Sequence, residues 1–110
     1  MLNRVRIILV SPSHPGNIGS AARAMKTMGL TRLYLVDPKI FPHSDATALA
    51  VGANDLLESA SICSSLDEAL MGTVFSVAAT ARNRDLSHQI MTPRQVADSF
   101  LGKTDEGDVA

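Results

Sequence analysis

The fold of this chain is constrained most by one feature: an apolar run followed by a turn and then by an amphipathic segment. Residues 5–10 read Val-Arg-Ile-Ile-Leu-Val, which is typical of a parallel strand covered on both faces. A helix is predicted next because apolar residues recur at helical spacing, at Ile18, Ala21, Ala22, Met25 and Met28. A second strand is predicted over residues 33–36 and ends at Asp37-Pro38. Strand, helix and strand in this order form a right-handed βαβ unit, so we expect a parallel sheet.

The turn before this helix combines glycine, asparagine and a nearby cation. Asn17 is the predicted N-cap, because its short side chain can accept a hydrogen bond from a free amide at the helix start. Gly16 and Gly19 lack a Cβ atom, so another backbone or a ligand can approach closely. The polar face of the helix carries Ser20, Arg23 and Thr27. A guanidinium beside free helix amides suits an anion such as a phosphate, although a plain turn with a solvated Arg23 would give the same pattern.

Predicted strands and helices alternate along the whole chain. The predicted strands cover residues 4–10, 33–36, 59–63 and 73–79, and the predicted helices cover residues 18–28, 45–51, 66–71 and 93–101. The predicted caps are Gly29 after the first helix, Ser44 or Asp45 before the second, Ser65 with Glu68 as a capping box, and Thr92. Residues 52–55 are predicted as a turn, residues 80–88 as a polar loop, and residues 107–110 as the start of another strand. This alternation predicts one α/β domain of three layers, a parallel sheet with helices on both faces.

Composition narrows the classes of protein to which this chain can belong. A single cysteine, Cys63, excludes an internal disulfide and is expected to pack in the interior. His43 and His88 fall in separate loops, so metal-ligand spacing is absent. There is no apolar run long enough to span a membrane and no basic-then-apolar N-terminus. We therefore expect a cytoplasmic protein that binds neither a metal nor a membrane.

The charges are distributed unevenly along the chain. The formal net charge is only −1, which does not by itself indicate a nucleic-acid-binding protein. Residues 1–36 nevertheless contain no acidic residue and five basic ones, namely Arg4, Arg6, Arg23, Lys26 and Arg32. Such an asymmetry predicts a positive patch on a weakly acidic body, as an RNA partner would require. Chance clustering of solvated side chains is the alternative.

Several segments together resemble the SPOUT class of RNA ribose 2′-O-methyltransferases, in its TrmH-like branch. The first motif of that family matches His14, residues 16–20 and residues 22–26. Further matches extend over nearly the whole chain, at residues 28–30, 33–36, 50–53, 66–70 and 80–82. Ser11 and Pro12 depart from the family pattern. The resemblance implies methyl transfer from S-adenosyl-L-methionine to a ribose 2′-hydroxyl.

The resemblance assigns the catalytic role to Arg23, with Asn17 beside it. Because a guanidinium hardly gives up its proton, we expect Arg23 to bind the adjacent phosphate and to stabilise the incipient alkoxide rather than to act as a base. Asn17 would orient Arg23 or contact the ribose. The structural alternatives are a salt bridge for Arg23 and a helix cap alone for Asn17.

Other residues are expected to bind cofactor or RNA by the same resemblance. The cofactor contacts would be Ala79, Thr80 and Ala81, at the carboxyl edge of the sheet where ligands of open α/β sheets bind. The RNA contacts would be His14, Ser20, Lys26, Arg82 and Arg84. The alternative for His14 is a histidine that only forms part of a turn. The alternatives for Arg82 and Arg84 are a solvated loop or a contact of that loop with a second subunit. The first strand is not followed by GxGxxG, which disfavours an ordinary dinucleotide-binding fold.

The resemblance also predicts what residues 1–110 lack. In the family, a Gly- and Glu-containing second motif and a third motif with Ser and Asn form a deep trefoil knot, most of the cofactor pocket and much of a homodimer interface. We expect residues 1–110 to be the N-terminal part of a SPOUT catalytic domain without this C-terminal segment, and to be inactive alone. The expected substrate is a pyrimidine ribose early in the tRNA anticodon loop. The alternatives are another RNA such as ribosomal RNA, or a non-catalytic α/β module that binds phosphate or RNA.

Overall fold

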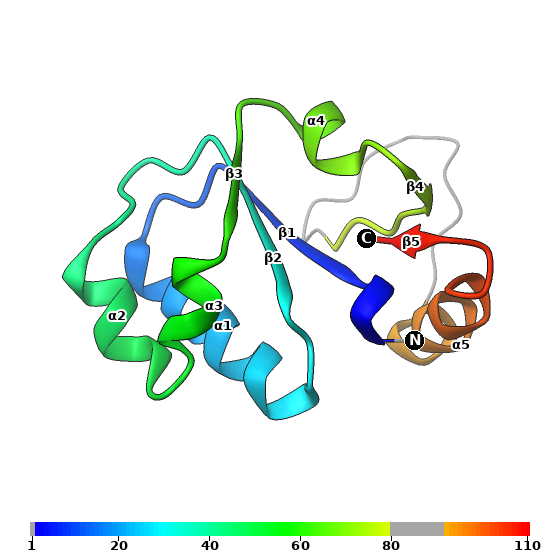
Figure 1. Ribbon diagram of the computed structural model, residues 1–110, viewed down its shortest axis with the longest axis horizontal. Coiled ribbons are helices and arrows are strands. Elements are labelled where there is room, and N and C mark those ends of the chain that lie inside the picture. Colours follow the sequence, from blue (N-terminus) through cyan, green and yellow to red (C-terminus); the bar gives the residue numbers. More distant parts are fainter. Residues whose placement is uncertain (1, 80–91) are drawn as a thin grey trace.

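The computed structural model describes residues 2–79 and 92–110, with its elements labelled in Figure 1. The strands are β1 (Arg6–Val10), β2 (Arg32–Val36), β3 (Ser61–Cys63), β4 (Thr73–Phe75) and β5 (Asp108–Val109). The α-helices are α1 (Pro15–Met28), α2 (Ser44–Ala50), α3 (Asn54–Glu58), α4 (Leu66–Leu70) and α5 (Pro93–Lys103). A short 3-10 helix, Leu2–Arg4, precedes β1. In this part of the chain no helix is long and apolar enough to cross a bilayer.

The described strands pair in parallel. β1 pairs with β2 and β2 with β3, in a register that aligns Leu9 with Leu35 and Leu35 with Ile62. β4 pairs with β5. A parallel bridge between Val5 and Val109 then places β5 beside the start of β1. The strand order is therefore β4-β5-β1-β2-β3, which confirms the predicted parallel α/β fold.

Helices cover both faces of this sheet. Successive side chains of a strand point to opposite faces, and Leu33 and Leu35 share the main core with Ile18 and Met25 of α1. On the other face, Val36 and the buried Cys63 pack with Ala69 of α4. Figure 1 shows α1, α2 and α3 together on one side and α4 on the other. The predicted three layers and the interior position of Cys63 are confirmed.

A glycine allows α1 and α2 to pack closely. A Cβ atom at Gly19 would overlap the carbonyl oxygen of Ala46, would lie 2.9 Å from its carbonyl carbon, and would lie 3.1 Å from the amide of Ala50. These are backbone atoms, which cannot move aside as a side chain can. Gly19 is therefore needed for the approach of the two helices, and the small residues Ala46 and Ala50 are fully buried beneath it.

The start of α1 differs from the prediction. The helix begins at Pro15, and its N-cap is His14, whose backbone is extended with φ −110°. Proline suits the first helical position because it has no amide hydrogen to satisfy and its φ is already helical. Asn17 therefore lies within the first turn, and its predicted role as the N-cap is wrong. The predicted end is confirmed, because Gly29 has a φ of 79° and its amide donates to the carbonyl of Lys26.

Other local predictions were corrected in their details. The predicted turn at residues 52–55 instead leads into α3, which buries Leu56 and Leu57. The cap of α2 is His43, whose Nδ1 accepts from the amide of Asp45. Ser65 caps α4 as predicted, but the Glu68 carboxylate accepts from the amide and hydroxyl of Ser64, so the predicted box is displaced by one residue.

The C-terminal elements follow the predictions more closely. Thr92 caps α5, and its amide donates to the Gln95 side chain to complete a capping box. Strand β4 is shorter than predicted, because it ends at Phe75. The predicted final strand is present as β5. The predicted loop at residues 80–88 lies outside the described residues.

Candidate active site

The outer face of α1 presents the polar residues that were predicted to act on RNA. The apolar face of α1 buries Ile18, Ala22 and Met25 against the sheet. Helical geometry therefore places Asn17, Ser20 and Arg23 on the exposed face. Residues three apart on a helix are neighbours, so these three side chains share one surface.

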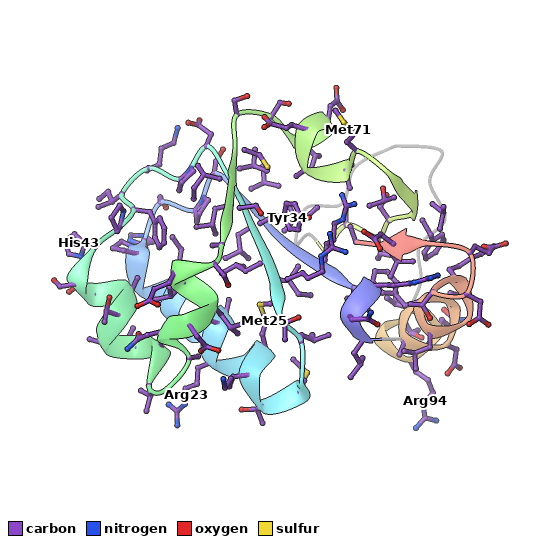
Figure 2. The ribbon with its side chains drawn as sticks, viewed as in Figure 1. Arg23, Met25, Tyr34, His43, Met71 and Arg94 are labelled. Carbon is purple, nitrogen blue, oxygen red and sulfur yellow. The ribbon has the colours of Figure 1, made fainter. Side chains whose placement is uncertain are left out.

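The Arg23 guanidinium projects from this face into solvent. Figure 2 shows its side chain pointing away from the body of the protein. Within the described residues it has neither an ion pair nor a side-chain hydrogen bond, although its backbone carbonyl accepts from the Thr27 hydroxyl at 3.1 Å. The alternative interpretation of Arg23 as a structural salt bridge has no support in this part of the chain.

Lys26 and His14 are also exposed near this face. The Lys26 Nζ lies 2.9 Å from the Asp55 Oδ2, and this hydrogen bond lowers the pKa of Asp55 below its usual value. Both side chains are more than half exposed, at 54% and 58%, and such pairs are weak. The ion pair therefore does not prevent Lys26 from binding a phosphate. His14 precedes α1 without a side-chain capping bond, so its ring is available to a ligand.

The other three basic residues of the predicted patch make internal contacts. Arg4 Nη1 donates to the Thr104 carbonyl at 2.7 Å. Arg6 is only 8% exposed, and Arg32 Nη1 lies 2.6 Å from the Asp108 Oδ2. Arg6 and Arg32 therefore do not contribute free charge to the predicted positive patch. They instead form ion pairs with Asp108, which is distant in sequence.

Arg6, Arg32 and Asp108 form a charged cluster that sequence reasoning missed. The Asp108 Oδ2 accepts from both guanidiniums, whose hydrogen bonds lower the pKa of this carboxyl below its ordinary value. The two guanidinium carbons lie 5.2 Å and 5.8 Å from the centre of the Tyr34 ring, within reach of cation–π attraction. The register aligns Arg6 with Arg32, and a buried cation such as Arg6 requires an acid. The sequence alone gave no signal that this acid would be Asp108.

The predicted cofactor edge is described only up to Ala79. Backbone pairing continues past β4 and β5, since Val77 donates to the Ala110 carbonyl at 2.9 Å and Ala110 donates to the Phe75 carbonyl at 3.1 Å. Ala79 therefore follows at the carboxyl end of β4 and is exposed. Thr80, Ala81, Arg82 and Arg84 lie outside the described residues.

A hollow lies at the carboxyl ends of β2 and β3. It has a volume of about 510 Å³, and its lining includes Asp37, Phe41, Cys63 and Glu68. Burial raises the pKa of the Cys63 thiol, with the Glu68 charge adding to the effect, so this thiol is a poor nucleophile. In the described ranges, no three His, Cys, Asp or Glu side chains are close enough together to hold a metal ion.

The whole chain is similar to known RNA methylases. The model of the SpoU rRNA methylase family matches residues 4–107. The chain is 48% identical over its whole length to the tRNA (cytidine/uridine/adenosine-2′-O-)-methyltransferase TrmJ of Pseudomonas aeruginosa (strain UCBPP-PA14), of which it covers 43%. It is 53% identical to the tRNA (cytidine/uridine-2′-O-)-methyltransferase TrmJ of Yersinia enterocolitica, again over 43% of that relative.

Solved structures give the same result. A "probable methylase family protein" from Haemophilus influenzae Rd KW20 superimposes with a TM-score of 0.91 at 42% identity, over all of this chain and 45% of that one. TrmJ from Z. mobilis ZM4 superimposes with a TM-score of 0.87 at 36% identity, over 97% of this chain and 46% of that one. The chain thus spans less than half of the length of each of these relatives.

Proposed function

This chain belongs to the SpoU rRNA methylase family, and on that premise we propose that it carries the RNA-facing part of a tRNA 2′-O-methyltransferase. The observation that supports this most directly is Arg23 on α1, which is exposed, has no ion pair among the described residues, and lies inside the segment that matches the family's first motif (Figure 2). The proposed reaction transfers a methyl group from S-adenosyl-L-methionine to a pyrimidine ribose in the anticodon loop of a tRNA.

Arg23 would supply charge rather than accept a proton. A ribose 2′-hydroxyl is a poor nucleophile and must lie in line with the methyl group that it attacks. A forked guanidinium can hold the neighbouring phosphate and stabilise negative charge as it develops on the 2′-oxygen. Ser20, one turn before Arg23, and His14, at the start of the same helix, would contact the RNA backbone on the same surface.

The cofactor would bind at the carboxyl edge beyond β4. Ala79 is small and exposed there, and the hydrogen bond between Val77 and Ala110 holds the preceding backbone in place. A small side chain at a parallel-sheet edge leaves room for a nucleoside-like group, so this edge fits S-adenosyl-L-methionine. When bound, the cofactor supplies an activated methyl group on a sulfonium. Ala79, with Thr80 and Ala81 after it, would hold its nucleoside part.

Two subunits would complete the site. Arg23 lies on the outer surface of α1, which covers the β1–β2 side of the sheet, whereas β5 separates β1 from β4. Such a separation favours a homodimer in which Arg23 of one subunit lies beside the Ala79 edge of the other. Sedimentation of the full-length protein tests this, and a monomer that is active at all concentrations would contradict it.

The substrate is proposed from the relatives. Both relatives are named for 2′-O-methylation of tRNA cytidine and uridine, and the Pseudomonas aeruginosa relative is also named for adenosine. A tRNA substrate places the proposed activity in the cytoplasm. The family's description mentions rRNA, so ribosomal RNA is the second candidate. Methylation assays with purified tRNA and rRNA, followed by mapping of the 2′-O-methyl nucleotide, distinguish the two.

Arg23→Ala in the full-length protein tests the proposed mechanism. We expect kcat/KM for tRNA methylation to fall by about a hundredfold or more, since the stabilising charge is lost. Arg23→Lys should recover only part of the activity, because an ammonium lacks the fork. Arg94→Ala is the matched control, because Arg94 also projects from an exposed helix face (Figure 2) and should leave the rate unchanged. Full activity of Arg23→Ala would remove Arg23 from the mechanism.

Calorimetry separates the enzyme from a non-catalytic module. Residues 1–110 contain only a part of the proposed cofactor site, so we expect no tight binding of S-adenosyl-L-methionine by this chain alone. The full-length protein should bind it. Tight binding by residues 1–110 would contradict the proposed division of the site.

A further inference from the structure

The sheet consists of two groups of strands that are joined to each other by very little backbone pairing. β1, β2 and β3 form one group and β4 with β5 the other. In the described residues, their ladders are linked by the bridge between Val5 and Val109. One bridge constrains the second group only weakly, so side chains must determine its orientation. Val109 and Phe75 contribute apolar packing against the main core, and charged side chains contribute the directional contacts.

Arg6 links the two groups through four hydrogen bonds. Its Nη1 donates to the carbonyls of Ala69 at 2.9 Å and Met71 at 2.7 Å, where α4 ends and the chain turns toward β4. Its Nη2 and Nε donate to the Asp108 Oδ2 of β5, at 2.9 Å and 3.3 Å. The carbonyls at the end of a helix lack backbone partners and attract cations. The same guanidinium on β1 therefore fixes both the beginning of β4 and the position of β5.

Arg32 and Tyr34 complete this joint from β2. Arg32 Nη1 donates to the same Asp108 oxygen at 2.6 Å, and its Nη2 donates to the Tyr34 hydroxyl at 2.9 Å. Asp108 in turn pairs in register with Thr73, the first residue of β4. The Asp108 carboxylate thus connects guanidiniums of both β1 and β2 to the strand that pairs with the start of β4.

This joint bears on catalysis because the two groups carry different parts of the proposed site. α1, with Arg23, follows β1, whereas Ala79 follows β4. We propose that Arg6, Arg32 and Asp108 are positioning residues for methyl transfer: they fix the cofactor edge relative to β1 and β2 of the same subunit and so, in the proposed dimer, relative to Arg23 of the other subunit. This inference rests on the proposed function. It assigns these three residues a task beyond stability, although they touch neither substrate nor cofactor.

Asp108→Asn in the full-length protein is the first test. The asparagine has the size of aspartate but no charge, so β4 and β5 should shift without loss of the fold. A displacement of about 1 Å can cost about a hundredfold in rate. We therefore expect a loss of about tenfold or more in kcat/KM, and weaker binding of S-adenosyl-L-methionine. Rates are to be measured at a temperature at which circular dichroism shows the variant to be folded.

Two further variants make the test specific. Lys103→Gln removes a surface ion pair with Glu106 from the same part of the chain, and its kcat/KM should stay within about twofold of wild type. Arg6→Lys retains the charge but loses the fork, so it should lose activity as Asp108→Asn does. If Asp108→Asn does not fold, Arg32→Gln, which leaves Arg6 and Asp108 paired, replaces it.

Hydrogen exchange separates the failure of this inference from the failure of the proposed function. In Asp108→Asn, the amides of residues 73–77 should exchange faster than in wild type, while those of β1 and β2 do not change. A folded variant with wild-type kcat/KM, wild-type cofactor affinity and unchanged exchange would overturn the positioning role. A wild-type protein that methylates no tRNA, by contrast, would count against the proposed function.

Discussion

Around β1–β3, buried apolar side chains such as Ile18, Met25 and Leu35 fill the space between α1 and the sheet. At β4–β5, Val109 joins the same apolar core and Phe75 packs against it, but the joint to β1 also contains an ion-pair cluster of Arg6, Arg32 and Asp108. Apolar burial does not depend on pH, whereas ion pairs depend on the ionisation of both partners. The comparison teaches that the proposed catalytic helix is fixed by apolar packing, while the position of the proposed cofactor edge depends on charge as well.

The largest expected effect tests the apolar part of this comparison. Gly19→Ala would force a Cβ atom against the backbone of Ala46, so α1 and α2 would have to separate. We expect a loss of about 3 kcal/mol in the free energy of unfolding, measured by urea denaturation. Gly102→Ala in α5 is the control, because its Cβ would meet nothing within 4 Å. That change should stabilise the protein by about 0.5–1 kcal/mol. A Gly19→Ala protein as stable as wild type would show that these two helices are not closely constrained.

A smaller effect, dependent on pH, is expected at the charged joint. The pKa of Asp108 is lowered in the folded protein by hydrogen bonds from Arg32 and Arg6, so its ionised form stabilises the fold above its ordinary pKa of 3.8. Asp108→Asn should cost about 2 kcal/mol at pH 7. The difference from wild type should shrink as the pH falls below 3.8, because the unfolded chain then takes up a proton at Asp108 while the folded protein, whose Asp108 pKa is lower, does so only at still lower pH.

The control for this prediction lies on the same side of the molecule. Asp98→Asn changes an exposed carboxyl of α5 and should alter stability little at any pH. The cost of Gly19→Ala should not vary with pH. If the cost of Asp108→Asn were equally constant from pH 7 to pH 3, charge would not be what holds β5 in place.

The smallest expected effect on stability concerns Lys26. Its ion pair with Asp55 is solvent-exposed, so Lys26→Gln should leave the urea midpoint unchanged. If Lys26 contacts a phosphate of the RNA, the same change should weaken tRNA binding by the full-length protein and reduce the slope of log K against log salt by about 1. If tRNA affinity and the salt slope did not change, Lys26 would have no role in RNA binding beyond its surface ion pair with Asp55.

Local patterns in the sequence were sufficient for much of the fold. The apolar run of β1, the helical spacing in α1 and the glycine after it each depend on residues within one turn or one strand. The helix α3 was missed because Gly52 and Asn54 are typical of a turn, and its five residues offer too short a pattern. Pro15 determined the first turn of α1 more strongly than Asn17, because a fixed φ acts without any partner.

In the candidate site too, the features that depend on local sequence could be predicted, and those that depend on distant residues could not. The exposure of Arg23 follows from helical spacing alone, and its proposed role comes from the motif around it. The role of Asp108 could not be predicted in this way, because its partners Arg6 and Arg32 lie 102 and 76 residues away in sequence. Charge counting assigned both arginines to a surface patch, since sequence does not reveal which distant acid will neutralise a cation.

The position of β5 has a consequence for how the molecule is made. β5 consists of residues 108 and 109, yet it lies between β4 and β1 in the middle of the sheet. As the chain emerges from the ribosome, β1 to β3 can fold with α1, α2 and α3 while β4 has no neighbouring strand to pair with. Closing so long a loop is slow compared with pairing nearby segments. Translation should therefore deliver the helix that carries Arg23 first, and the edge proposed for the methyl donor should take shape only after residue 109 has been synthesised.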